Sequence, residues 1–94
     1  MYNYYPWNIQ VLVAWLELEV SRGKSPDELA DSLHIPSNIL NDWLRVQSPS
    51  KWTPITLKQI QAIAQYRGWG FNQTVEWLGI NASHLEELIE TSNG

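Results

Sequence analysis

Few side chains in this sequence have the types and spacing that catalysis requires. His34 and His84 are isolated, and the neighbouring Glu86 and Glu87 are typical of a solvated helix face rather than of a glycosidase carboxylate pair. The chain has no cysteine, no metal-ligand spacing and no glycine-rich phosphate loop. We therefore expect no enzyme activity, no catalytic residue, no metal, no cofactor and no small-molecule substrate.

Aromatic residues are the most unusual feature of the composition. The 94 residues include six tryptophans, namely Trp7, Trp15, Trp43, Trp52, Trp69 and Trp77. Most of these large rings are expected to fill a core. Those around the first apolar segment have a second interpretation, because amphipathic aromatic side chains favour interfaces. The candidate partner-binding residues are Tyr4, Tyr5, Trp7 and Trp15.

The charge balance bears on both partner and compartment. The net charge is −4, whereas nucleic-acid-binding domains usually carry a basic excess that neutralises phosphates. The longest apolar-rich stretch, residues 9–18, is too short to span a bilayer, and no signal segment is evident. The lack of cysteine fits a reducing compartment. We expect a cytoplasmic protein that does not contact membranes.

The sequence matches itself at an offset of 45 residues. Without a gap, the offset produces seven identities where about two or three would arise by chance. The identical pairs are Trp7 with Trp52, Leu12 with Leu57, Arg22 with Arg67, Gly23 with Gly68, Leu33 with Leu78, Ile35 with Ile80 and Leu40 with Leu85. We predict an internal repeat, with a first unit over residues 6–47, a second over 52–91 and a short linker over 48–51.

Each unit is predicted to contain three helices. In the first unit, Asn8 begins a helix that Gly23 ends, Ser25 begins a second helix, and a third follows the turn at residues 34–36. In the second unit, the helices begin at Thr53-Pro54, at Gly70 and at Asn81. The predicted fold is all-α, with about six helices packed as one compact domain over residues 1–94.

Residues 29–43 resemble the helix-turn-helix superfamily. This motif places a small residue where its two helices cross, and Ala30 occupies that position. Apolar residues lock the two helices together, and here they are Leu33, Ile35, Leu40 and Trp43. Each copy departs from the pattern once, since His34 replaces the turn glycine in the first and Val75 replaces the small residue in the second.

The resemblance implies a DNA-reading surface on the third helix of the first unit. In helix-turn-helix proteins this helix enters the major groove, where Asn pairs with adenine and Arg with guanine or phosphate. The matching glutamates of the second unit would repel phosphates, so the first unit would dominate. The candidate DNA-binding residues are Ser37, Asn38, Asn41 and Arg45, together with Lys51 and Lys58 from a modest positive patch around the linker.

The first predicted helix is apolar on nearly every side over residues 9–20. A helix of this kind is buried on more than one side. Either the second unit wraps it, or it forms a homodimer seam or a docking surface for another protein. The second interpretation predicts an oligomer that depends on concentration.

Two functions remain open from the sequence. The first is a small DNA-binding protein or transcriptional regulator, which Asn38, Asn41 and Arg45 favour. The second is an acidic protein-interaction or adaptor domain that kept the helix-turn-helix fold and lost DNA binding. The negative charge and the glutamate-rich last helix favour the second function. The charge around the third helix of each unit discriminates between them, because a negative face excludes DNA.

Overall fold

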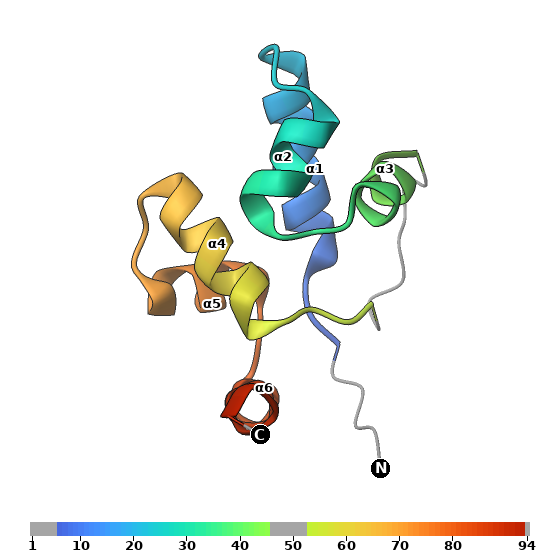
Figure 1. The fold of residues 1–94 in the computed structure, drawn as a ribbon. Helices are drawn as coiled ribbons and strands as arrows, with labels where there is room; N and C mark the ends of the chain where they lie inside the picture. Colours follow the sequence, from blue (N-terminus) through green and yellow to red (C-terminus); the bar gives the residue numbers. More distant parts are fainter. Residues whose placement is uncertain (1–5, 46–52, 94) are drawn as a thin grey trace.

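Six helices and no strand occur in the described part of this computed structural model, which comprises residues 6–45 and 53–93. They are α1 (Ile9–Ser21), α2 (Pro26–Leu33), α3 (Ser37–Arg45), α4 (Leu57–Arg67), α5 (Phe71–Leu78) and α6 (Ala82–Asn93). The predicted all-α fold is therefore confirmed. The radius of gyration is 12.9 Å, close to the value of about 12 Å that a globular chain of this length has. Figure 1 shows α6 set at one end of the molecule.

Side-chain caps determine where several helices begin. At the start of α2, Ser25 Oγ accepts the N–H of Glu28 at 3.1 Å, and Pro26 occupies the first turn, as the sequence predicts. At the start of α6, the Asn81 side chain accepts the N–H of His84 at 2.8 Å. Asn8 precedes α1 but makes no side-chain cap hydrogen bond.

The start of α4 differs from the prediction. The helix begins at Leu57 rather than at Thr53-Pro54. Thr56 Oγ1 accepts the N–H of Gln59, and the Gln59 side chain accepts the N–H of Thr56, both at 3.1 Å. This reciprocal capping box satisfies two backbone donors, whereas a proline-led start three residues earlier would leave Thr56 without that role.

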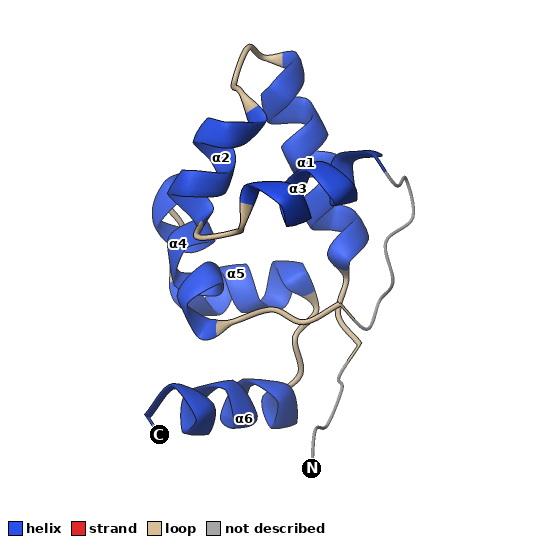
Figure 2. Cartoon of the chain, turned by 45° about the vertical axis from the view of Figure 1, so that its right-hand side comes forward, coloured by secondary structure: helices blue, strands red, loops and turns tan. Residues whose placement is uncertain are grey.

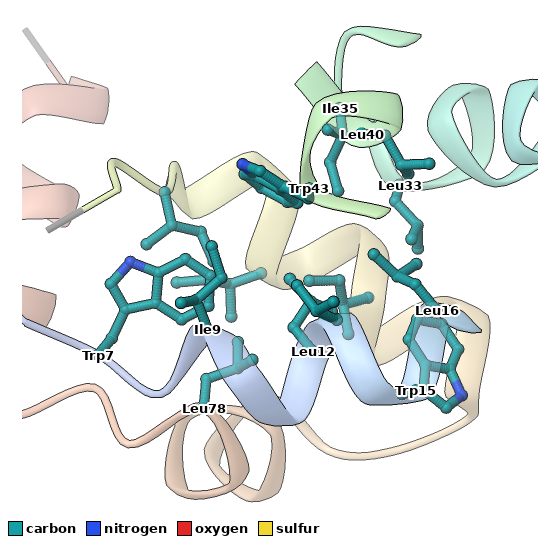
Figure 3. Packing of buried hydrophobic residues seen from close by; sticks show 14 of the residues in the cluster. Trp7, Ile9, Leu12, Trp15, Leu16, Leu33, Ile35, Leu40, Trp43 and Leu78 are labelled. Atoms are coloured by element: carbon teal, nitrogen blue, oxygen red, sulfur yellow. The ribbon is translucent and has the colours of Figure 1, made fainter. Parts of the chain in front are cut away.

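The core forms around α1. Leu12 and Leu16 are completely buried, and α1 packs against α3 on one side and α5 on another. Figure 3 shows Leu40 approaching α1 from one side and Leu78 from the other. The remaining α1 surface is a mostly polar stripe of Gln10, Ala14, Glu17 and Ser21 beside the exposed Leu18. Helices α3 and α5 thus cover α1 from two sides, which agrees with the first of the two interpretations drawn from its apolar sequence.

Turns 45 residues apart have the same backbone hydrogen bonds. Ile35 N–H donates to Ala30 O at 3.0 Å, and Ile80 N–H donates to Val75 O at 3.1 Å. The bounds of α2 and α5 differ by that same offset, and His34 and Gly79 follow them in the left-handed region, at φ 57° and 67°. The packing differs, because α2 packs against α3 and α4, whereas α5 packs mainly against α4 and α1.

These two turns generate a paired stability prediction. Glycine adopts the left-handed conformation without strain, whereas a side chain costs about 1–2 kcal/mol there. Gly79→Ala should therefore lower the free energy of unfolding by about 1 kcal/mol. His34→Gly should cause no loss, because relief of strain offsets the added freedom of the unfolded chain. Urea denaturation of both variants measures the difference, and equal losses in the two variants would contradict the assigned backbone conformations.

Candidate functional site

The exposed face of α3 carries four of the predicted DNA-binding residues. Ser37, Asn38, Asn41 and Arg45 are all exposed. On the opposite side of the helix, Leu40 is completely buried and Trp43 is 7% exposed, which holds the polar face outward. The structure therefore brings these four residues together on one accessible surface. Lys51 lies outside the described residues.

Internal contacts already engage the two best base-reading candidates on this face. The Asn41 amide donates to the carbonyl of Ser37 at 2.8 Å. The Arg45 guanidinium donates to the Asp42 carboxylate at 2.6 Å, and both side chains are largely exposed to water. An exposed ion pair contributes little to stability, so a ligand could displace it. Its two charges nevertheless cancel, and α3 has no net charge.

Two carboxylates of α2 line a hollow at the beginning of α3. A shallow hollow between α2, the turn and α4 is lined by Asp27, Asp31, Ser37 and Lys58, among others. Lys58 thus lines the same hollow as two carboxylates, whose charges outweigh its own. Helix α2 carries Asp27, Glu28 and Asp31 and no basic residue. The surface next to α3 is therefore acidic.

The candidate partner surface near the start of α1 is not exposed where it is described. Trp7 is 4% exposed and Trp15 is 8% exposed, so both belong to the core. The indole N–H of Trp7 donates to the carbonyl of Thr53, which joins the start of α1 to the segment before α4. Burial removes the large apolar area of each ring from water, which explains the placement. Tyr4 and Tyr5 lie outside the described residues.

A cluster of aromatic rings around Arg67 was not predicted from the sequence. The guanidinium carbon lies 3.7 Å from the ring centroid of Trp69, 4.6 Å from that of Trp77 and 5.0 Å from that of Trp15. The rings of Trp69 and Trp77 meet edge to face at 5.4 Å, as do those of Trp15 and Tyr66 at 5.5 Å. These distances are typical of cation–π and aromatic pairs. We name Arg67, Tyr66 and the three tryptophans the arginine–aromatic cluster.

Arg67 is the last residue of α4, and its guanidinium lies against aromatic rings. Burial lowers the pKa of Arg67, and the nearby Glu19 carboxylate opposes this effect. Three members of the cluster, Trp15, Tyr66 and Arg67, also line a hollow whose lining is completed by Leu18, Glu19 and Arg22. Only the spacing of Arg67 and Trp69 was visible in the sequence, since Trp15 and Trp77 come from other helices.

Helix α6 presents a different face from α3. Ile89 is 41% exposed, Glu86 and Glu90 are exposed, and no basic residue occurs in this helix. His84 is buried at 7% exposure, and burial lowers its pKa while Glu87 opposes the shift. The residues that follow Asn41 and Arg45 by 45 positions, Glu86 and Glu90, thus lie on a helix with an exposed aliphatic side chain.

Other site types find no support among residues 6–45 and 53–93. No cluster of three or more His, Asp or Glu residues there could hold a metal ion. In that part of the chain, every helix is too short or too polar to cross a membrane. Comparison of the chain with protein-family models, curated proteins and solved structures found no match.

The arginine–aromatic cluster generates a stability prediction. Arg67→Ala should lower the free energy of unfolding by about 1–2 kcal/mol, because it removes cation–π contacts and the packing of the side-chain stem. The matched control is Arg22→Ala, whose exposed side chain makes only a 3.8 Å ion pair with Glu19. That variant should lose less than about 0.5 kcal/mol. Urea denaturation compares them, and equal losses would show that the rings do not stabilise Arg67.

Proposed function

We propose that this chain is an acidic protein-interaction domain, built from two copies of a helix-turn-helix-like unit, that does not bind DNA. The charge around α3 is the observation that carries this proposal. In DNA-bound helix-turn-helix proteins, the helix preceding the recognition helix crosses the phosphate backbone. Here that helix is α2, with three acidic side chains and no basic one. It would repel the phosphates that α3 must approach.

Hydrogen bonds at the helix ends support the duplication. Lys24 N–H donates to Glu19 O at 3.1 Å, and its counterpart Trp69 N–H donates to Ala64 O at 2.9 Å, 45 residues later. The same offset relates the bonds that close the turns after α2 and α5. Matching turns in both halves are expected if one unit was copied and its backbone retained.

The packing of α2 on α3 supports the helix-turn-helix resemblance. Ala30 is 3% exposed on α2, a helix that packs against α3. The four residues expected to lock the helices are all buried, namely Leu33, Ile35, Leu40 and Trp43. In the second unit, α5 packs mainly against α4 and α1, which makes the first unit the better match.

The exposed face of α3 fits a protein partner. Ile39 is 39% exposed on this helix, at the flank of the polar face and three residues before Asp42, which pairs with Arg45. An aliphatic anchor within a polar rim is the usual composition of a protein interface. The amide side chains on the same face offer hydrogen bonds to backbone or side-chain groups of the partner.

A second candidate function is DNA binding by the first unit. The exposure of Asn38, Asn41 and Arg45 on one helix after a tight turn favours it. Displacement of Asp42 from Arg45 would free the guanidinium for a base or a phosphate. The acidic residues of α2 would remain beside the phosphates, so this function ranks second.

Photo-crosslinking tests the proposed function. A photo-reactive amino acid at position 39 should capture protein in the host cell, because this position would lie in the interface. The same residue at Gln61, an exposed position of α4, serves as the control and should not give the same adduct. We expect protease to destroy the captured adduct and nuclease to leave it intact.

A DNA-binding assay tests the second candidate function. In low salt, fluorescence anisotropy with fragments of host DNA should detect no binding by the full chain. Binding that Asn41→Ala or Arg45→Ala abolishes, in variants with unchanged circular dichroism, would establish the second candidate function instead. An adduct at position 39 that nuclease removes would lead to the same conclusion.

A further inference from the structure

The last turns of α1 and α4 form a surface that is both apolar and positive. Leu18 is 46% exposed, and the hollow beside it is lined by Arg22, Arg67, Glu19 and two aromatic rings. Two guanidinium groups and one carboxylate give this lining a net positive charge in a chain whose net charge is −4. We name Leu18, Arg22 and Arg67 the basic groove.

Both arginines of the basic groove can bind a carboxylate. The tryptophan rings hold the Arg67 guanidinium in place and partly remove it from water, which reduces the cost of orienting it. Arg22 is only loosely paired, at 3.8 Å from Glu19, and its side chain is 63% exposed. It can therefore turn toward an incoming anion. Leu18 supplies an aliphatic contact next to these charges.

Helix α6 combines an exposed aliphatic side chain with negative charges, which complements the basic groove. Glu86 and Glu90 lie four residues apart on one stripe of the helix, and Ile89 is beside them at 41% exposure. Leu18 and Ile89 are two of the exposed large hydrophobic residues of the described chain. One lies among arginines and the other among glutamates, so both apolar contact and charge match between the two surfaces.

The two surfaces cannot meet within one chain. Figure 2 shows α6 at one end of the molecule and the turn that follows α1 at the other. The principal extents of 37 × 26 × 22 Å describe an elongated particle that keeps these ends apart. We propose that a second copy of this chain places its α6 on the basic groove, with Ile89 against Leu18 and with Glu86 and Glu90 facing Arg22 and Arg67.

This association is distinct from the proposed function, because it uses neither α3 nor its exposed residues. It joins unlike surfaces head to tail, so copies add in a chain unless the rotation between neighbours closes a ring. Charges at the rim of an interface are screened by salt. The complex should therefore grow with protein concentration and weaken as ionic strength rises.

Charge exchange between two variants tests the proposal. Arg22→Glu spoils the basic groove and leaves α6 intact, whereas Glu90→Arg spoils α6 and leaves the groove intact. Each variant alone should associate at least about tenfold more weakly than the natural chain in sedimentation velocity. An equimolar mixture should recover association, because an intact α6 then meets an intact groove and the reversed charges also pair with each other.

Controls separate this effect from net charge and misfolding. Lys58→Glu and Glu76→Arg alter exposed residues outside both surfaces and change the net charge by the same amounts. They should associate like the natural chain, and all variants should keep its circular dichroism and melting temperature. A natural chain that stays monomeric up to millimolar concentration would overturn the proposal. So would association that persists in both single variants, a mixture without recovery, or capture of a different protein by the basic groove.

Discussion

Burial of α1 on several sides is the constraint on which the rest of the structure depends. Its mostly apolar surface cannot be covered by the two helices that follow it, so α5 of the second half must cover what α3 leaves open. Leu12 and Leu16 are fully buried as a result. Complete burial of such a side chain contributes about 1.5–3 kcal/mol, a large share of the stability of a domain this small. This requirement joins the two halves into one core.

The two halves of the chain have similar turns and different outward surfaces. Residues that form turns and lock helices are similar in both halves, as the hydrogen bonds after α2 and α5 illustrate. The outward faces of α3 and α6 differ, because Arg45 is matched by Glu90 and Asn41 by Glu86. The outward face of α3 thus combines polar side chains with Ile39, whereas that of α6 combines glutamates with Ile89.

Much of the fold was predictable because local signals determine it. Ser25 and Pro26 define the start of α2, and the left-handed Gly79 defines the end of α5. The start of α4 was predicted too early, because Thr53 and Thr56 are both acceptable caps and only the reciprocal bond with Gln59 distinguishes them. The Thr-x-x-Gln spacing of Thr56 and Gln59 is a capping-box signature in the sequence itself, and the predicted start at Thr53-Pro54 gave it too little weight.

The candidate site was less predictable, because its features depend on contacts between distant segments. The polar face of α3 follows from helical spacing, so its four residues were foreseen together. The burial of Trp7 depends on Thr53, and the arginine–aromatic cluster requires Trp15 and Trp77 to meet Arg67 from two other helices. No spacing within one helix predicts such a meeting. The pairing of Arg45 with Asp42 is local, yet its consequence for DNA depends on the acidic residues of α2.

Native-state hydrogen exchange tests most directly the claim that one core unites both halves. If α1 belongs to that core, its amides and those of α4 should exchange only through global unfolding, with the same free energy of opening. Leu12→Ala should lower that free energy equally in α3 and α5, because both helices pack on α1. Protection that persists in α4 and α5 while α1 to α3 exchange freely would contradict the shared core and would show two halves that fold independently.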